Sequence, residues 1–560
     1  MHIVEKLRSE VREALIIAVE KSIEAGELPA LEIPSFTLEV PREKDHGDFA
    51  TNLAMMLAKP ARNAPRKIAD ILVKNLKAGN SRVKNIEIAG PGFINFYLDE
   101  GWPLEGFPAI FNENEDYGRV ALGGGKKVQV EFVSANPTGL LHMGNARGAA
   151  LGDSLAGILD FAGYDVSREY YINDAGKQIE NFGLSLEARY FQLLGREGDI
   201  PEGGYHGQDI TDTVENFVKQ CGDKYLDAEE TSRRSALIEF SLREKLDAIK
   251  KGLEEFGVEY NVWFSEQSLH DSGKVDKAIK LLQDSGHTYE QEGALWFKAT
   301  DFGVEKDEVL VRKNGIPTYF AADAAYHMDK FLRGFDWVIN VWGADHHGHV
   351  PRMKGVVDAL GYDPNTLDVV IMQLVRLFRG GEMVRMSKRT GQFITLEELV
   401  EEVGKDAARY FFVMRSSDSH LDFDLDLAKS KTNENPVYYI QYAHARICSI
   451  LRQPGATEII DQAREGMYLQ KLSGEAELAL ARRLVDLPEE ITYAAGQLAP
   501  HRIARYLHEV AGLLHSFYNA HRVITEDKEL SIARLALVDA TRIILRNGLQ
   551  LLGLTAPEKM

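Results

Sequence analysis

Residues Lys127-Val-Gln-Val-Glu-Phe-Val133 are followed by His142-Met-Gly-Asn145 and by an apolar-periodic run over 146–161. The first part predicts a strand and the last part a helix. Where a helix follows a strand, its free N-terminal amides and its positive dipole end favour bound phosphate. Gly144 lets a ligand approach the backbone, and His142 can hydrogen-bond to a phosphate oxygen. The stretch therefore predicts a strand–loop–helix unit that binds phosphate.

A second string, Arg385-Met-Ser-Lys-Arg389, stands in a glycine-flanked loop far along the chain. Lys388 is a cation suited to the charge that develops on a leaving pyrophosphate, where transition-state electrostatics act. Taken alone, each string has a plainer explanation. A His beside a Gly is usually a turn, and a Ser-Lys-Arg run is usually a solvated loop. Their order and separation together indicate an ATP site.

Both strings resemble the HIGH and KMSKS signatures of class I aminoacyl-tRNA synthetases. The matches are imperfect, because Asn145 replaces the last His of the first signature, and Arg385 and Arg389 replace the outer residues of the second. The resemblance implies catalytic roles for His142 and Lys388 and a need for ATP and Mg²⁺. It also implies an ATP-binding set of His142, Gly144, Asn145, Met386, Ser387 and Lys388.

The composition is that of a large globular enzyme. The chain has 560 residues, of which 44% are hydrophobic and 27% charged, and it can form several domains with sizeable cores. Its two cysteines, Cys221 and Cys448, are too few for a disulfide framework or a cysteine-ligated zinc site. We find no apolar signal core at the N-terminus and no membrane-length apolar run. We therefore expect a cytosolic protein with no membrane attachment.

The net charge of −20 has to be reconciled with a nucleic-acid substrate. An acidic total disfavours non-specific adhesion to polyanions, because Lys and Arg supply most of the affinity for phosphate backbones. It does not exclude a local basic face. Arginines recur in the C-terminal region, at Arg446, Arg452, Arg502, Arg505, Arg522, Arg542 and Arg546. Any one of them can equally be an ordinary helix-surface charge.

The hydrophobic patterns divide the chain into three parts. Residues 1–118 mix helical and strand patterns and predict a small α+β domain. Residues 119–404 alternate strands and helices, which is the signature of a parallel, Rossmann-like sheet, with a mainly helical insertion over about 178–291. Residues 405–560 are helical almost throughout. The expected fold class is therefore α/β, with a small N-terminal α+β domain and an all-α C-terminal bundle.

Local patterns predict individual elements within these parts. Strand-like runs are expected at 36–40 and 371–378, an antiparallel pair at 86–88 and 93–97, and a hairpin of 309–313 with 316–320 around Asn314-Gly315. Two helix starts carry capping residues, namely a capping box at Thr395-Leu-Glu-Glu398 and an N-cap with a first-turn proline at Asn435-Pro436.

Two strings raise the question of a metal site. Asp45-His-Gly-Asp48 contains ligand-type residues, but a turn held by Asp side chains explains it better. Asp345-His-His-Gly-His349 has three histidines, yet they cannot all enter one tetrahedral site from a regular element. The i, i+4 pair of histidines typical of zinc-binding helices is also absent. We therefore expect no metal site on the protein.

Further strings, spread over essentially the whole chain, are similar to the arginyl-tRNA synthetase family. They are Glu131-Phe-Val-Ser-Ala-Asn-Pro137, Pro317-Thr-Tyr-Phe-Ala-Ala-Asp323, Gly343-Ala-Asp-His-His-Gly348, Gln441-Tyr-Ala-His-Ala-Arg446 and Phe517-Tyr-Asn-Ala-His-Arg-Val523. The resemblance implies an arginine-binding set of Glu131, Ser134, Asn136, Tyr319 and Asp323. It adds Gly343, Asp345 and His346 to the ATP-binding set, and it assigns Tyr442, Arg446, Asn519 and Arg522 to tRNA.

The chemistry of arginine agrees with these assignments. A guanidinium has five donors, no acceptor and a permanent charge, so a selective pocket needs a carboxylate. Asp323 and Glu131 are the candidates. Asp323 alone could also be a first-turn acid that balances a helix dipole.

The activity that the resemblance implies is the ATP-dependent attachment of L-arginine to tRNA(Arg) through an arginyl-adenylate. The C-terminal helices would bind the anticodon arm, the N-terminal domain would bind the outer corner of the tRNA, and the protein would be a monomer. Three alternatives stay open. They are another class I synthetase, a small-molecule nucleotidyltransferase with the same ATP motifs, and a non-catalytic RNA-binding protein on a synthetase scaffold.

Overall fold

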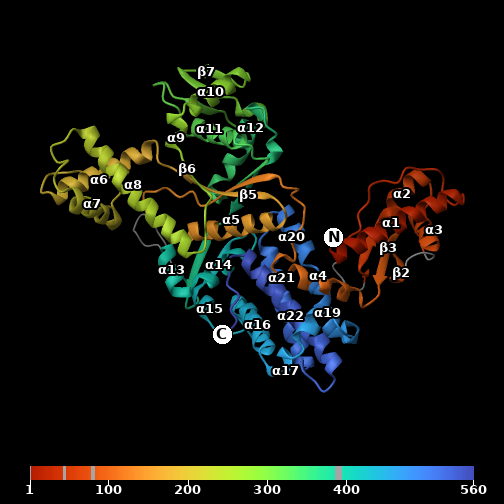
Figure 1. The fold of residues 1–560 in the computed structure, drawn as a ribbon. Helices are drawn as coiled ribbons and strands as arrows, with labels where there is room; N and C mark the ends of the chain where they lie inside the picture. Colours follow the sequence, from red (N-terminus) through yellow and green to blue (C-terminus); the bar gives the residue numbers. More distant parts are fainter. Residues whose placement is uncertain (1, 42–45, 77–81, 385–393) are drawn as a thin grey trace.

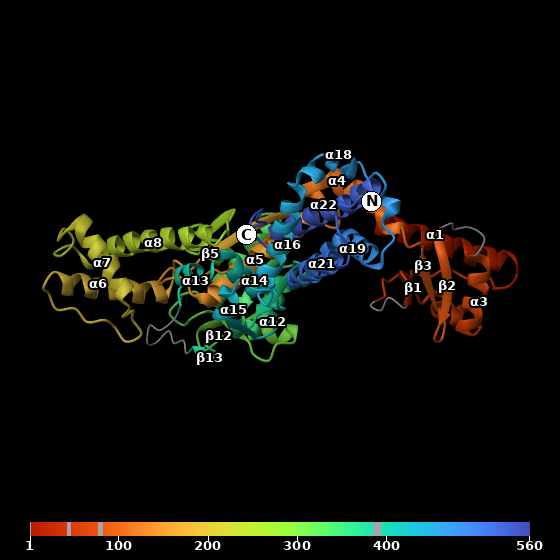
Figure 2. The same ribbon diagram turned by 90° about the horizontal axis from the view of Figure 1, so that it is seen from below.

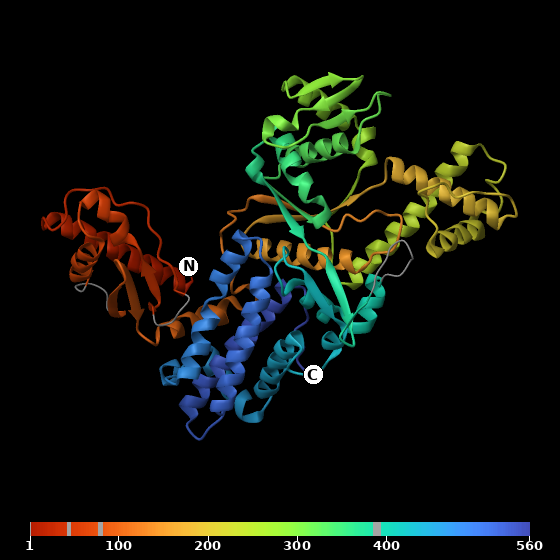
Figure 3. The same cartoon turned by 180° about the vertical axis from the view of Figure 1, so that it is seen from behind.

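The computed structural model describes residues 2–41, 46–76, 82–384 and 394–560. Figure 1 shows an N-terminal module set to one side, a central α/β body, and a helical arm that projects on the other side. The C-terminal helices lie between the central body and the N-terminal module, as the view from behind also shows (Figure 3). No helix in the described ranges is both long and apolar enough to cross a membrane.

The N-terminal module packs helices on a small antiparallel sheet. Its elements are α1 (Ile3–Glu24), β1 (Phe49–Thr51), α2 (Leu53–Ala61), α3 (Pro65–Leu76), β2 (Val83–Ala89) and β3 (Phe93–Leu98), with strand order β1-β3-β2. The predicted antiparallel pair is confirmed, since Ile86 lies opposite Phe96 and Ile88 opposite Ile94. The strand predicted over 36–40 is wrong, because this segment forms only one isolated bridge, Glu39 with Ala50.

The central body is built on a five-stranded sheet in which every neighbouring pair is parallel. Its order is β11 (Leu367–Met372), β10 (Trp337–Gly343), β4 (Lys127–Glu131), β5 (Asp165–Ile172) and β6 (Val262–Ser265). The predicted Rossmann-like sheet is thus confirmed. In a parallel sheet all carboxyl ends meet at one edge, so side chains that follow different strands are brought together there.

Helix α5 (Met143–Phe161) packs closely against the chain that leaves β4. A Cβ on Gly152 would overlap the ring of Phe132, so this position has to be glycine for the helix to approach. Strand β4 ends at Glu131, two residues earlier than predicted, because Val133 and Ser134 adopt positive φ values of 68° and 40°. Neither residue can continue an extended strand in that conformation.

Two groups of elements are inserted between the strands of this sheet. The arm consists of α6 (Lys177–Leu193), α7 (Gln208–Cys221) and α8 (Glu230–Glu255), which enclose their own apolar cluster and project away from the N-terminal module (Figure 2). Strand β6 then follows, so a strand of the main sheet lies inside the stretch 178–291. The second group comprises α9 (Gln267–Asp271), α10 (Lys274–Asp284), β7 (Thr288–Gln291), β8 (Ala294–Phe297), β9 (Glu308–Val311), α11 (Tyr319–Leu332) and, after β10, α12 (Val350–Ala359).

The hairpin predicted over 309–320 is wrong in its second half. Beyond the Asn314-Gly315 turn, only Pro317 pairs with β9, in an isolated bridge to Val311. The side-chain oxygen of Thr318 accepts a hydrogen bond from the backbone N–H of Ala321, and α11 begins at Tyr319. An N-cap therefore outweighs the alternating pattern, and it places Tyr319 one turn before Asp323 on the same helix.

A second small sheet connects the main sheet to the C-terminal helices. It contains β12 (Val375–Arg379), β13 (Glu382–Val384) and β14 (Leu421–Asp424), flanked by α13 (Leu396–Val403), α14 (Lys405–Val413) and α15 (Leu425–Lys429). The single strand predicted over 371–378 is thus divided between β11 and β12. The capping box at the start of α13 is confirmed, because Thr395 and Glu398 bond to each other's backbone N–H.

The C-terminal part is an all-α bundle, as predicted. Its helices are α16 (Pro436–Leu451), α17 (Pro454–Thr457), α18 (Ile460–Arg464), α19 (Glu475–Val485), α20 (Leu487–Gly496), α21 (His501–Ala520) and α22 (Lys528–Leu551). The Asn435 side chain accepts a hydrogen bond from Val437 N–H, which confirms the predicted N-cap of α16.

The N-terminal module is anchored to this bundle through Asp48. Its carboxylate accepts hydrogen bonds from Leu98 N–H (2.8 Å) and from the Trp102 indole (3.2 Å), and it forms an ion pair with Arg482 of α19. Asp48 thus holds a domain junction. The turn predicted for the Asp-His-Gly-Asp string stays a prediction, because Asp45 lies outside the described residues. Helix α4 (Phe107–Glu113) leads from the module into the central body.

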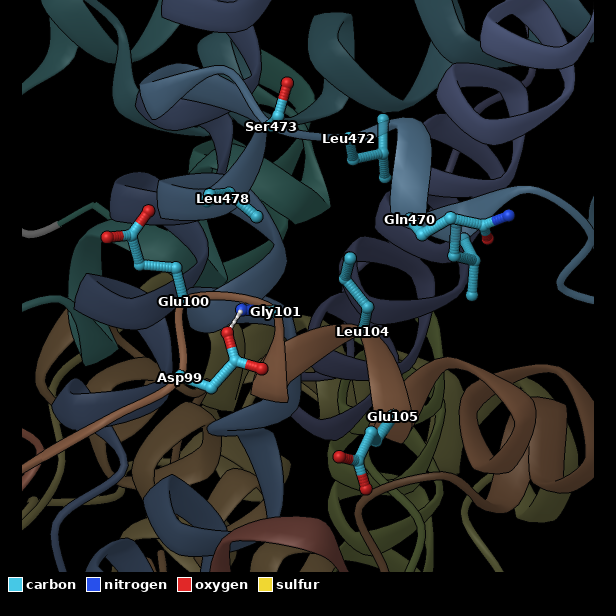
Figure 4. A pocket seen from close by; sticks show the side chains of 10 residues that line it. Asp99, Glu100, Gly101, Leu104, Glu105, Gln470, Leu472, Ser473 and Leu478 are labelled. Carbon is cyan, nitrogen blue, oxygen red and sulfur yellow. Dashed lines mark hydrogen bonds between the residues drawn. The ribbon is translucent and has the colours of Figure 1, made fainter. Parts of the chain in front are cut away.

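A pocket of about 470 Å³ opens at the same junction, between the segment that follows β3 and the segment around the start of α19 (Figure 4). Leucine side chains of both segments line it, together with three carboxylates. The carboxylates are already engaged: Asp99 with Gly101 N–H (3.1 Å), Glu100 with Lys84 (2.7 Å) and Glu105 with Arg82 (3.1 Å). The pocket is therefore a packing gap between domains.

Arg409 of α14 joins the sheet, the arm and the bundle. Its side chain is fully buried. The guanidinium donates to Asp153 of α5 (2.6 Å), to the carbonyls of Phe256 and Gly257 after α8 (3.2 and 3.0 Å), and to the carbonyl of Leu552 after α22 (3.0 Å). A buried charge is tolerated only when it is paired and hydrogen-bonded, and this one is.

We expect Arg409→Met to destabilise the fold by about 3–5 kcal/mol, because the carbonyls of Phe256, Gly257 and Leu552 lose their buried donor and Asp153 keeps only Arg168 (2.9 Å) of its two described ion-pair partners. Thermal unfolding followed by circular dichroism measures the effect. The matched control is Arg505→Met. Arg505 is 81% exposed and pairs only with Glu509 on its own helix, so its loss should change stability by less than about 1 kcal/mol. Equal melting temperatures for the two variants would contradict the role given to Arg409.

Candidate active site

The candidate site lies at the carboxyl edge of the parallel sheet. Glu131 ends β4, Glu266 directly follows β6, and Gly343 ends β10. The N-terminus of α5 reaches the same edge from the loop after β4. The sheet therefore brings together residues that lie more than 200 positions apart in the sequence.

His142 caps the N-terminus of α5. Its ring Nδ1 accepts a hydrogen bond from the backbone N–H of Gly144 (3.1 Å), and the backbone N–H of His142 donates to the side-chain oxygen of Asn145 (3.1 Å). This reciprocal pair is a capping box in which His142 takes the place of the usual Ser or Thr. Because Nδ1 is an acceptor, the neutral ring carries its proton on Nε2. Asn145 therefore has a structural use that its deviation from the HIGH signature did not suggest.

The chain that follows the second signature returns to this helix start. Residues 141–143 and 394–396 pair through the backbone: His142 forms a bridge with Thr395, Met143 N–H donates to the Ile394 carbonyl (3.2 Å), and Leu396 N–H donates to the Leu141 carbonyl (2.9 Å). The chain that leaves the second signature is thus fixed beside His142. Met386, Ser387 and Lys388 themselves lie outside the described residues.

Arg147, one turn further along α5, fixes the chain before the second signature. Its guanidinium is fully buried and donates to the carbonyl of Gln373 between β11 and β12 (2.5 Å). It also donates to the carbonyls of Ser416 and Ser419 (3.1 Å each). The chain is therefore held to α5 or its cap at Gln373, before the segment 385–393, and at residues 394–396, after it.

The strained turn after β4 holds Ser134 at the site. Positive φ at non-glycine residues costs roughly 1–3 kcal/mol each, so the surroundings must fix Val133 and Ser134. Strand β5 does so: Tyr171 N–H donates to Ser134 Oγ (3.1 Å), and Asn173 Nδ2 donates to the Ser134 carbonyl (3.2 Å). Asn136, two residues further, is exposed at the same edge.

Glu131 is buried and already paired. Lys330, whose side chain is completely buried, donates to one carboxylate oxygen (2.6 Å), and the Ser134 hydroxyl donates to the other (2.9 Å). Lys330 also donates to Asn340 Oδ1 (2.8 Å). Glu131 therefore has its charge compensated within the protein, which suits it to fix the site more than to neutralise a ligand.

Asp323 is the site carboxylate that projects from α11. It is 8% exposed, and its Oδ2 lies 3.0 Å from Nε2 of His349. Burial raises the pKa of Asp323, although His349 acts in the opposite direction. Tyr319 is 56% exposed one turn earlier, and the Asp323 charge, followed by burial, raises the pKa of its hydroxyl. As the fifth residue of α11, Asp323 is beyond the first turn, which weakens its interpretation as a dipole-balancing acid.

Glu266 is a second buried carboxyl that the sequence analysis missed. It is 5% exposed, and no described cation forms an ion pair with it. Burial, followed by the charges of Asp323 and Asp174, raises the pKa of Glu266 to about 7. The preceding β-type run, Val262-Trp-Phe-Ser265, was the available signal, but the stretch had been assigned to a helical insertion.

A buried polar network lies behind these acids. Asn340 accepts from Lys330, so its amide must donate to Nε2 of His327 (2.9 Å), and Nδ1 of His327 donates to the Asp323 carbonyl (2.8 Å). Burial lowers the pKa of His327 well below its usual range, so the ring is neutral. The network connects Glu131 to Asp323 and fixes the distance between them.

The residues expected near adenosine lie at the end of β10. Gly343 ends the strand, and a side chain on it would collide with the Asp345 carboxylate. Asp345 and His346 are exposed on the 3-10 turn Ala344–His349, with the His346 ring 6.0 Å from the Trp342 ring. Among the described residues, no group of three His, Cys, Asp or Glu side chains could hold a metal ion.

The residues assigned to tRNA share one surface of the bundle. Tyr442 and Arg446 lie on α16, Asn519 lies near the end of α21, and Arg522 follows it; the last two are exposed. Arg446 stacks over the Tyr518 ring at 3.9 Å, and Tyr442 stacks with His515 at 6.4 Å. Aromatic and guanidinium planes are groups on which nucleic-acid bases stack, and the four stacked side chains are half-buried here.

Several C-terminal arginines have partners within the protein. Arg502 pairs with Glu490, Arg505 with Glu509, Arg542 with Asp539 and Arg452 with Glu558, and Arg546 donates to Asn114. For these five, the interpretation as helix-surface charges is sufficient. The surface around Arg446 and Arg522 is the part of the set that can serve a polyanion.

Three family models match successive parts of the chain. Residues 5–98 match "Arginyl tRNA synthetase N terminal domain", residues 107–420 match "tRNA synthetases class I (R), catalytic domain", and residues 440–560 match "DALR anticodon binding domain".

Curated and solved relatives agree with these models. The arginine–tRNA ligase of Desulforamulus reducens is 64% identical over the full length of both chains. The structure of a putative arginyl-tRNA synthetase from Campylobacter jejuni is 34% identical, with a TM-score of 0.75, and covers 83% of this chain and 100% of its own. The Thermus thermophilus arginyl-tRNA synthetase structure, at 24% identity and TM-score 0.72, shows the same fold over 99% of this chain and 100% of its own.

The raised pKa of Glu266 predicts a pH-dependent cost to stability. An acid whose pKa rises from 4.5 to about 7 on folding binds its proton more tightly in the folded state. The cost of ionising it is absent below pH 4.5, grows as the pH rises to 7, and reaches about 3 kcal/mol above that. In the ligand-free protein, Glu266→Gln should therefore raise the melting temperature at pH 8 and change it little at pH 5.

Differential scanning fluorimetry at the two pH values measures this effect. The control is Glu259→Gln, because Glu259 is exposed and should give the same small change at both pH values. A melting temperature of Glu266→Gln that falls equally at pH 5 and pH 8 would show that Glu266 is stabilised as an anion.

Proposed function

The chain belongs to the arginyl-tRNA synthetase family of class I aminoacyl-tRNA synthetases, and on that premise we propose how its residues perform the reaction. It is an arginine–tRNA ligase that uses ATP, with L-arginine and tRNA(Arg) as substrates. The arginine carboxylate attacks the α-phosphorus of ATP, which releases pyrophosphate and forms arginyl-adenylate. A ribose hydroxyl of the terminal adenosine of tRNA then attacks the acyl carbon and releases AMP.

His142, Gly144 and the N-terminus of α5 are proposed to bind the phosphates of ATP, and Lys388 to neutralise the leaving pyrophosphate. The observation that supports this proposal is the backbone pairing of 141–143 with 394–396, because it brings the chain that begins five residues after the second signature to the helix start formed by the first. Met386 and Ser387 belong to the same proposed contact. Such a site works by positioning and by charge neutralisation, and little acid–base chemistry is required.

Gly343, Asp345 and His346 are proposed to contact the adenosine, and Asn145 to hold the cap of α5. Mg²⁺ is proposed to arrive with ATP. The described residues offer no protein cage for a metal, whereas Mg²⁺ prefers phosphate oxygens and water. We therefore assign no protein ligand to it. When bound, the ion would share the phosphate charge with His142 and Lys388.

Asp323 and Glu266 are proposed to receive the guanidinium of arginine, with Tyr319 at the open side. The charges favour this arrangement: Glu131 is neutralised by Lys330, while Asp323 and Glu266 have no Lys or Arg partner among the described residues. One guanidinium then compensates the charge of Asp323 and lowers the pKa of Glu266, so that Glu266 loses its proton. Ser134 and Asn136 are proposed to face the amino-acid end, on the turn that β5 holds.

Tyr442, Arg446, Asn519 and Arg522 are proposed to contact the anticodon arm, since the first two stack on rings of α21 and the last two are exposed at the end of that helix. The N-terminal module is proposed to bind the outer corner of the tRNA. The domain limits 1–118, 119–404 and 405–560 are proposals. We also propose that the protein is a monomer and that it lies in the cytosol, where the three substrates occur. The mass of the protein in solution tests the monomer.

We expect Lys388→Ala to lower the rate of adenylate formation by about 100-fold or more, because a single donor aimed at the transition state commonly contributes roughly 2.7–4 kcal/mol. ATP binding should change much less. Single-turnover formation of arginyl-adenylate and equilibrium ATP binding separate the two effects. Lys313→Ala is the control, since Lys313 is exposed and pairs only with Glu292. A nearly normal burst of adenylate in Lys388→Ala would remove Lys388 from this role.

We expect Asp323→Asn to raise the KM for arginine by about 100-fold, because it removes the charged partner of a desolvated guanidinium. The KM for ATP should change little. Arginine-dependent pyrophosphate exchange in the presence of tRNA measures both constants. The matched control is Asp301→Asn: Asp301 pairs with His287 at 2.9 Å, as Asp323 does with His349, but in a more exposed place. An unchanged KM for arginine in Asp323→Asn would refute the pocket.

A further inference from the structure

The assigned roles leave His347, Gly348 and His349 of the Asp345–His349 string unused, and of these His349 contacts a proposed arginine-binding residue. Its Nε2 lies 3.0 Å from Oδ2 of Asp323, and its side chain is only 18% exposed. The rings of Trp342 (5.5 Å) and Phe320 (5.9 Å, edge-on) enclose it. A half-buried ring with packed neighbours and one short polar contact has little freedom to turn away.

The contact fixes one oxygen of Asp323 and leaves the other for a ligand. Oδ2 accepts from His349, while the described residues provide no hydrogen-bond partner for Oδ1. The Asp323 carbonyl is held separately by His327. The carboxylate can therefore rotate about its own side-chain bonds unless His349 holds it. A bidentate contact to a guanidinium requires a fixed carboxylate plane.

His349 also connects two segments with different proposed ligands. It is the last residue of the 3-10 turn that carries Asp345 and His346, whereas Asp323 belongs to α11. We infer that His349 is a positioning residue for arginine: it orients the Asp323 carboxylate towards the guanidinium and ties that carboxylate to the segment proposed for adenosine. The inference rests on the proposed role of Asp323.

A second His–Asp contact occurs in the chain, outside the proposed arginine pocket. His287 Nδ1 lies 2.9 Å from Asp301 Oδ2, with the side chains 35% and 44% exposed. His287 also packs against an aromatic ring, that of Phe302, at 4.7 Å. This pair is a matched control, because it repeats the His–Asp contact and the ring contact outside the proposed pocket.

The test compares His349→Leu, His349→Gln and His287→Leu by steady-state pyrophosphate exchange with tRNA present. Removing a hydrogen bond to a charged group should raise the KM for arginine about tenfold or more in His349→Leu, with kcat at saturating arginine nearly unchanged. A Gln side chain can place an amide N–H where Nε2 was, so His349→Gln should return the KM to within about threefold of the original. His287→Leu should leave both constants unchanged.

A double-mutant cycle with Asp323→Asn tests whether His349 acts through Asp323. If it does, His349→Leu has little further effect on the KM for arginine once Asp323 is Asn. Additive effects, an unchanged KM in His349→Leu, a loss confined to kcat, or an equal loss in His287→Leu would each overturn the inference. If His349→Leu does not fold, a comparison of His349→Gln with His349→Asn tests the inference instead, since Asn cannot reach the Nε2 position. Equal KM values for arginine in these two variants would overturn the inference.

The failure of this inference can be told apart from failure of the proposed pocket. An Asp323→Asn enzyme with a normal KM for arginine refutes the pocket itself. An Asp323→Asn enzyme with the expected defect, together with a normal His349→Leu enzyme, refutes only the role of His349.

Discussion

The backbone pairing of residues 141–143 with 394–396 is the constraint on which the rest of the site depends. It joins segments about 250 residues apart, so the arm, four strands of the main sheet and two strands of the smaller sheet must all fold between them and still return the chain to the cap of α5. Ordering so long a stretch is entropically costly, and the apolar core of the sheet has to supply the compensation. Arg147 of α5 also holds the carbonyl of Gln373, which precedes the segment 385–393 in the chain. The geometry at the start of α5 therefore depends on the folding of the whole central body.

The charges of the site follow one pattern with one exception. Glu131 is compensated by Lys330, Asp323 is held by His349, and Arg409 beneath α5 is compensated by Asp153. Among the described residues Glu266 has no such partner, and burial raises its pKa to about 7. A protein that selects a cationic substrate has to leave some negative charge uncompensated. If Asp323 and Glu266 receive the guanidinium as proposed, the site gives up part of its stability when empty and recovers it when the cation binds.

The sequence predicted the elements whose determinants are local. The capping box at Thr395, the N-cap at Asn435 and the unit of β4 and α5 each depend on a few adjacent residues. Prediction failed where the partner is distant. Strand β6 is recognisable only beside β5, so the local pattern places it inside the helical insertion and assigns Glu266 no role. His349 was left without a role because Asp323 is its neighbour in space only. Lys388 stays a prediction, since it lies outside the described residues.

The arm formed by α6, α7 and α8 occupies a particular topological place. It leaves the sheet after β5 and returns to β6, which is the parallel neighbour of β5. A parallel neighbour can be reached only by a crossover connection, which in most sheets is a single helix. Here that connection is drawn out into a separate body with its own apolar cluster. The length of this connection is therefore independent of strand order. Residues can be inserted into it or deleted from it without a change in the order of strands at the carboxyl edge of the sheet.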